Sequence, residues 1–126
     1  MNEFEKYKAE AQEKWGKTDA YRQHAEKTAD YSEQKWNSLS DETDRIMAEF
    51  ALCMKSGVAP DSDEAQGLVK TLQQHITENF YRCTDEILSG LGQMYVADER
   101  FKKNIDRHAD GTAAFICEAV SAYCRH

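Results

Sequence analysis

The chain has 126 residues, of which 40% are hydrophobic and 31% are charged, and its formal net charge is −7. This length suits one domain with a small core and well-solvated helix faces. The acidic balance argues against direct DNA or RNA binding by this chain, because contact with phosphates needs a basic face.

The sequence also bears on cellular location. It contains no run of about 18 apolar residues, so we expect no membrane span. The polar opening residues lack the apolar core of a signal peptide. Four cysteines lie far apart and form no CxxC pair: Cys53, Cys83, Cys117 and Cys124. We therefore expect reduced thiols and a cytoplasmic protein.

The first 31 residues carry only thin helical stripes. Residues 2–15 place apolar side chains every three or four positions, ending at Trp15, and Gly16 ends that pattern. A second short helix carries Tyr21, Ala25 and Ala29. Neither stripe buries enough apolar surface to order itself alone. We therefore treat residues 1–31 as a conditional helical lid.

We expect the remainder of the chain, residues 32–126, to form a compact domain. Helix periodicity recurs between short breaks, and no strand alternation is found. The expected helices cover about 32–56, 62–80, 84–97, 98–107 and 111 onward. Their predicted N-caps are Ser32, Asp61 or Ser62, Thr84 and Asp98. The predicted fold class is all-α, a globin-like compact bundle of about five helices preceded by a mobile N-terminal segment.

Few residues suggest catalysis or metal binding. No histidine follows a glutamate by three positions, so the di-iron pattern of helical bundles is missing. The cysteines and histidines lack the close pairs that zinc needs. Cys83 with His75 could form a nucleophile and base, but a buried thiol and a satisfied histidine are the plainer interpretation. Haem on His75 has only fold analogy behind it. We predict no enzyme, metal or cofactor.

The aromatic residues are more informative. Three lie on the lid, which has too little core to bury them: Trp15, Tyr21 and Tyr31. Aromatic side chains that have no core of their own to pack into suggest a surface that binds a partner or ligand. The lid would close on a cleft walled by Trp36, Phe50, Met54, His75, Tyr81, Tyr95 and Phe101. For Trp36, Phe50, Phe101 and Phe115, a place in the core is the favoured interpretation.

Several stretches together resemble one family. They are WGKTDAYRQ (15–23), KTADYSEQKW (27–36), GVAPDSDEAQGLV (57–69), FYRCTDEILSGLGQMYVADERFKKNID (80–106) and the weaker GTAAFICEAV (111–120). These resemble the TipAS antibiotic-recognition domain, the C-terminal effector module of MerR-type transcriptional activators. The resemblance implies a globin-like domain that binds bulky drugs such as thiopeptides. It also implies an N-terminal part that is mobile without ligand and closes over it.

One position departs from the family pattern. A thiopeptide-binding member captures its drug through a cysteine in the helix before MYV, and that position is Gly90 here. Cys83 matches a different family cysteine. This departure from the family pattern favours non-covalent binding of a large, partly apolar drug.

The resemblance also sets the expected partners. DNA contact would come from a missing N-terminal helix-turn-helix domain, and dimerisation from a missing coiled coil. The alternatives are a protein-interaction module and a standalone drug-sequestering protein. The chain could equally be an excised domain or a short form begun at an internal methionine.

Overall fold

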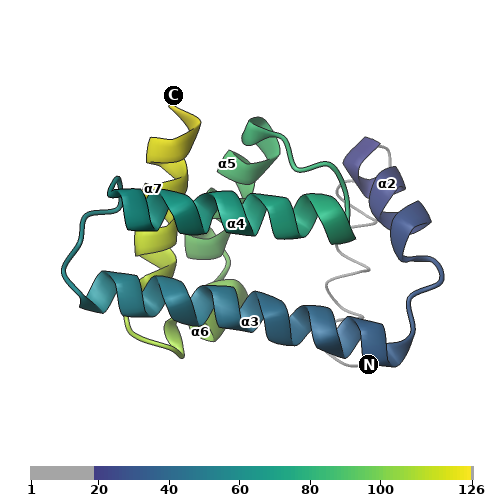
Figure 1. Cartoon of the computed structure of the whole chain (residues 1–126), viewed down its shortest axis with the longest axis horizontal. Helices are drawn as coiled ribbons and strands as arrows, with labels where there is room; N and C mark the ends of the chain where they lie inside the picture. Colours follow the sequence, from purple (N-terminus) through teal and green to yellow (C-terminus); the bar gives the residue numbers. More distant parts are fainter. Residues whose placement is uncertain (1–18, 126) are drawn as a thin grey trace.

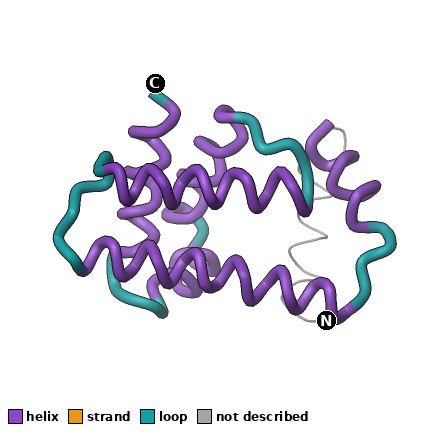
Figure 2. The backbone as a smooth tube through the Cα atoms, in the orientation of Figure 1, coloured by secondary structure: helices purple, strands orange, loops and turns teal. Residues whose placement is uncertain are grey.

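The computed structural model describes residues 19–125, which form six helices (Figure 1). They are α2 (Asp19–Thr28), α3 (Glu33–Lys55), α4 (Asp63–Asn79), α5 (Asp85–Ala97), α6 (Glu99–Asp106) and α7 (Thr112–Cys124). The part of the chain so described contains helices and loops without a strand (Figure 2). Within these residues no helix has the length and apolar character needed to cross a membrane.

The two longest helices, α3 and α4, run side by side in opposite directions (Figure 1). The hydroxyl of Ser32 accepts a hydrogen bond from Lys35 N, and that of Ser62 accepts one from Ala65 N. These bonds satisfy amides that the first helical turn leaves free. After α3 the chain reverses at Gly57, whose φ of +87° is a left-handed conformation suited to glycine.

Asp98 forms the corner between α5 and α6. It ends α5 and begins α6, where its carboxylate accepts from the backbone N of Arg100 at 2.9 Å. The Arg100 side chain also binds this carboxylate, at 2.9 Å from Nη2 to Oδ2. Hydrogen bonding from Arg100 lowers the pKa of Asp98 to about 2. The carboxylate is therefore charged across the physiological range.

The last helix, α7, crosses behind the α3–α4 pair and packs most extensively on α5 (Figure 1). Gly111 precedes it with φ of +90° and offers no capping side chain. Asp106 of α6 supplies that function, because its Oδ1 accepts from Ala113 N at 2.9 Å. Gly92 lets α5 approach closely, since a Cβ there would lie 3.2 Å from Val120 Cγ1.

The core lies where α3, α4, α5 and α7 meet. Its largest fully buried side chains are Phe50, Leu72, Leu88, Ile116, Val69, Val120 and Thr112. Because α7 crosses the α3–α4 pair and does not run along it (Figure 1), the packing resembles the predicted globin-like arrangement more than an aligned helix bundle. The all-α prediction and the five helices over residues 32–126 are confirmed.

Candidate functional site

An aromatic cluster forms where α2 meets the start of α3 and the end of α4. The Phe80 ring stacks on His24 at 5.8 Å between centroids and on Trp36 at 6.0 Å. Tyr31 meets Trp36 edge-on at 5.5 Å, and Tyr81 lies 6.3 Å from His24. The cluster joins lid residues to residues of the compact domain.

The same junction has hydrogen bonds from lid side chains to main-chain groups. Lys27 Nζ donates to Thr77 O at 2.9 Å, and the Tyr31 hydroxyl donates to Asn79 O at 2.6 Å. Gln23 Oε1 accepts from Arg82 N at 2.9 Å. The first two bonds satisfy carbonyls that the end of α4 leaves without intrahelical partners, and the Lys27 charge suits the negative end of the helix dipole.

His75 lies on the inner face of α4 and is only 5% exposed. Its Nε2 is 2.8 Å from Thr43 Oγ1, and that hydroxyl donates its single hydrogen to Leu39 O. Thr43 must therefore accept from Nε2–H. The opposite nitrogen, Nδ1, lies 3.2 Å from the amide Nδ2 of Asn79, which can only donate. His75 is thus a neutral imidazole with its hydrogen on Nε2.

Burial lowers the pKa of His75, against the opposing charges of Glu42 and Glu78. In the unfolded chain this histidine takes a proton near its ordinary pKa of 6.5, while burial in the folded protein lowers that pKa, so the folded imidazole stays neutral to lower pH. The unfolded state then binds more protons, so the free energy of unfolding is expected to fall as the pH drops below about 6.5. One such group contributes at most about 1.4 kcal/mol per pH unit.

Urea unfolding of the wild type and of His75→Gln at pH 7.5 and 5.5 checks this expectation. The variant should lose less stability on acidification. His108→Gln is the matched control, because His108 is half-buried and bonded to Asp44 at 2.9 Å, in the α6–α7 connection. Equal acid sensitivity of wild type and His75→Gln would show that His75 titrates alike in both states.

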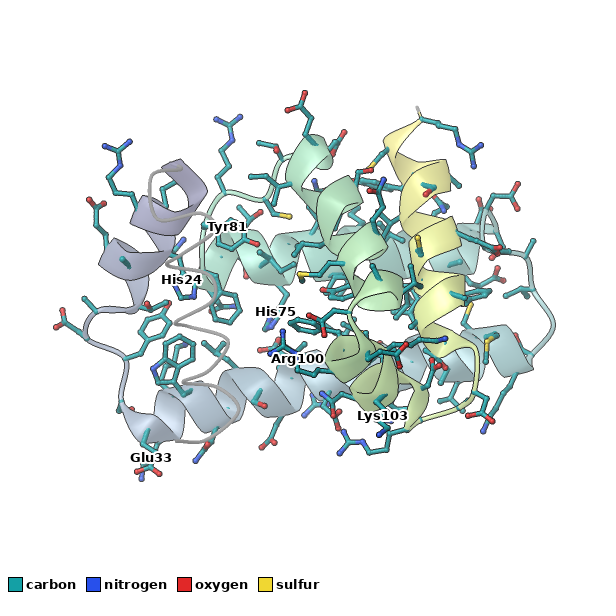
Figure 3. All side chains as sticks on the ribbon, turned by 180° about the vertical axis from the view of Figure 1, so that it is seen from behind. His24, Glu33, His75, Tyr81, Arg100 and Lys103 are labelled. Atoms are coloured by element: carbon teal, nitrogen blue, oxygen red, sulfur yellow. The ribbon has the colours of Figure 1, made fainter. Side chains whose placement is uncertain are left out.

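Tyr95 and Phe101 form a second aromatic pair at the α5–α6 corner. Their ring centroids lie 6.1 Å apart. Tyr95 is 7% exposed, and burial raises the pKa of its hydroxyl. Phe101 is half-buried at the edge of the core. Figure 3 shows Arg100 from this corner and His75 from α4 extending toward the same side of the molecule, with His24 and Tyr81 beyond.

The structure separates two predicted wall residues from this region. Phe50 is fully buried in the core, as the favoured interpretation of that residue predicted, and not in a cleft wall. Met54 lies near the end of α3 beside Gly111, where a Cβ would be 3.7 Å from its sulfur. At 1.5 Å rise per residue, about 27 Å of helix separates Met54 from Trp36. Trp15 and the side chain of Tyr21 lie outside the described residues.

Three residues of the junction were missed among the sequence candidates: His24, Asn79 and Phe80. Phe80 stands directly at the predicted helix break beside Tyr81, and that position was the available signal. His24 gave no such signal, because its ring partner Phe80 lies on a different element. Asn79 gave none either, because it is a polar residue whose partner, His75, lies one turn earlier on the same helix. A hollow of about 340 Å³ is lined by Tyr81 and by three residues of α2: Gln23, Glu26 and Lys27.

Three further residues bear on the chemistry of the site. Burial raises the pKa of the Cys83 thiol to about 11, so it is protonated and a poor nucleophile near neutral pH. Burial likewise raises the pKa of Tyr81 to about 12, which keeps its hydroxyl neutral. Gly90 lies exposed on α5, and a Cβ added to it would meet no other atom within 4 Å, so a side chain would fit there.

Comparison with known proteins identifies relatives of this chain. The helix-turn-helix transcriptional activator TipA of Streptomyces coelicolor is 42% identical over 118 residues, or 94% of this chain and 47% of that protein. The activator mta of Bacillus subtilis is 40% identical over 100 residues, covering 79% of this chain and 38% of its own length. The chain thus spans about half or less of the curated relatives it matches.

Two solved structures share the fold. TipAS of Streptomyces lividans in complex with the thiopeptide nosiheptide aligns with a TM-score of 0.86 and 40% identity, covering 96% of this chain and 85% of that one. The antibiotic-binding domain of a TipA-class multidrug resistance regulator aligns with a TM-score of 0.64 and 37% identity, covering 69% and 93%.

Residues 7–123 match the TipAS antibiotic-recognition domain along nearly the whole chain. That family consists of binding domains of transcription regulators and not of enzymes, as the sequence predicted. The chain therefore belongs to the TipAS antibiotic-recognition domain family.

Proposed function

We propose that this domain binds a bulky, partly apolar antibiotic, of the thiopeptide kind, between the lid and the compact domain. The observation that carries the proposal is the aromatic junction of His24, Tyr31, Trp36, Phe80 and Tyr81. It places large rings where the lid meets the compact domain. The likeness to the nosiheptide complex of TipAS supports this location.

We further propose that the lid, residues 1–31, orders when the drug binds. From Arg22 onward, α2 is exposed except for His24 and Thr28, which are half-buried. Holding each backbone residue costs about 1–2 kcal/mol. Burial of apolar area returns only about 25 cal/mol per Å². A large ligand is therefore needed to offset the ordering of so polar a segment.

Binding is proposed to be reversible. Gly90 offers no thiol, and the Cys83 thiol is buried and protonated near neutral pH. In a full-length regulator, this domain would pass drug binding to a helix-turn-helix domain and a dimerising coiled coil, in the cytoplasm where promoter DNA lies. The TipA and mta activators support that setting, since both are helix-turn-helix proteins.

Titration with nosiheptide and a panel of hydrophobic drugs tests the proposal. Tryptophan emission should change and the melting temperature should rise, because a ligand at 100 times its Kd stabilises the folded state by about 2.7 kcal/mol. The wild type should release intact drug on denaturation. Gly90→Cys serves as the comparison that supplies an exposed thiol. Unchanged emission and melting temperature across the panel would refute drug binding.

The alternative is a protein-interaction module in which the lid is a permanent part of the fold, and it is favoured by the hydrogen bonds of Lys27 and Tyr31 to α4. Hydrogen exchange of α2 separates the two functions. Protection that appears only with drug supports sensing. Full protection in the drug-free domain supports the interaction module.

A further inference from the structure

Asn79, the last residue of α4, contacts both the buried His75 and the lid residue Tyr31. Its Nδ2 donates to the backbone O of His75 at 2.9 Å and faces His75 Nδ1 at 3.2 Å. Its own backbone O accepts from the Tyr31 hydroxyl at 2.6 Å. The next residue, Phe80, stacks on His24 of the lid and meets the His75 ring edge-on at 5.9 Å.

This arrangement requires His75 to accept at Nδ1. The hydrogens run in one direction, from the Asn79 amide to Nδ1 and from Nε2–H through the Thr43 hydroxyl to Leu39 O. A proton on Nδ1 would point at the Asn79 N–H groups, so that two donors would face each other. The Asn79 amide would then have to turn away from the imidazole.

Charged groups near His75 favour that turn once the proton arrives. Glu42 of α3 has its Oε2 3.6 Å from Nδ1 and is half exposed. Glu78 of α4 also acts on the imidazole. On the lid, the titratable ring of His24 stacks on Phe80, which also contacts His75. Glu42 can therefore take the new N–H in place of Asn79.

We propose that Asn79 is a positioning residue that couples neutral His75 to the docked lid, so that protonation of His75 releases the lid. The proposal rests on the lid function stated above and adds its regulation. The path from His75 to the lid is short. The side chain of Asn79 donates to the imidazole, and the backbone carbonyl of Asn79 accepts from the Tyr31 hydroxyl. The adjoining Phe80 ring stacks on His24.

Nitrogen NMR of the His75 imidazole tests the positioning role without any drug. The wild type should show the Nε2–H form at pH 7.5. In Asn79→Asp a carboxylate replaces the donor but the backbone carbonyl for Tyr31 remains, so Nδ1 should become protonated and titrate at higher pH. Identical tautomers and titration in the two proteins would overturn the proposal.

The release of the lid is read from the Arg82 amide, whose N–H is accepted by Gln23 of α2. Its hydrogen exchange, corrected for the intrinsic effect of pH, should speed up between pH 7.5 and 5.5 in the wild type and much less in His75→Gln. His108→Gln should behave as the wild type. Equal changes in wild type and His75→Gln would overturn the coupling.

Nosiheptide binding gives the functional readout. The Kd of the wild type should rise roughly threefold to tenfold between pH 7.5 and 5.5, because one linked proton changes an equilibrium by at most tenfold per pH unit. The Kd of His75→Gln should change by a smaller factor, and an equal factor would contradict the proposal. Absence of binding at both pH values would instead refute thiopeptide binding, while the NMR and exchange results still decide the coupling.

Discussion

Phe50→Ala is expected to lower the free energy of unfolding by about 3–5 kcal/mol, the usual cost of removing a fully buried phenylalanine. Phe50 is 0% exposed and belongs to the central cluster of α3, α4, α5 and α7. Folded domains are stable by only about 5–15 kcal/mol, so this one change would bring the protein close to its folding limit. Urea unfolding at neutral pH measures the effect.

Leu52→Ala is the matched control, two residues along the same helix. Leu52 is 66% exposed, and its truncation should change the free energy of unfolding by no more than about 0.5 kcal/mol. The pair also separates the two roles considered for Phe50. A Phe50→Ala protein that remained as stable as the wild type but lost drug binding would place Phe50 in the cleft wall and contradict a core role.

Trp36→Ala is expected to weaken nosiheptide binding by roughly 30-fold or more, equivalent to about 2 kcal/mol, the threshold for an aromatic hot spot. Trp36 is half-buried and contacts the rings of His24, Tyr31 and Phe80. Its removal would delete the ring contacts of the domain with Tyr31 and one of those with His24. The loss of stability should be smaller than for Phe50→Ala, since Trp36 lies outside the central core.

Titration calorimetry of the wild type, Trp36→Ala and Trp36→Phe measures this effect. Trp36→Phe keeps a ring against Phe80 and should retain most of the affinity. Wild-type affinity in Trp36→Ala would place the drug away from the lid junction, and an equal loss in Trp36→Phe would assign the effect to the indole N–H.

The helix starts could be predicted from the sequence because the interactions that create them are local. Ser32, Ser62 and Thr84 each accept a hydrogen bond from an amide three residues ahead, and Asp98 from one two residues ahead. Such caps involve one turn of chain and need no tertiary information. The sequence left Asp61 and Ser62 as alternatives, and the structure selects Ser62.

The candidate site was harder to predict. Helical periodicity shows which face of a helix points inward, but it does not show which other elements that face packs against. Phe50, Met54 and Trp36 all lie on the inward stripe of α3, yet only Trp36 reaches the lid. The stacking of His24 on Phe80 joins residues 56 positions apart, and no local pattern encodes it. The sequence therefore identified the helices that meet at the junction but not which of their inward residues lie in the core.

Three side chains of the lid form hydrogen bonds to backbone groups of the compact domain. Lys27, Tyr31 and Gln23 bind Thr77 O, Asn79 O and Arg82 N, which every residue type except proline at position 82 would supply. Substitutions along residues 77–82 can therefore change the side chains at this junction without removing the three attachments. Under the proposed function, related domains can differ in the side chains that face a drug while the lid keeps the same attachment to the backbone.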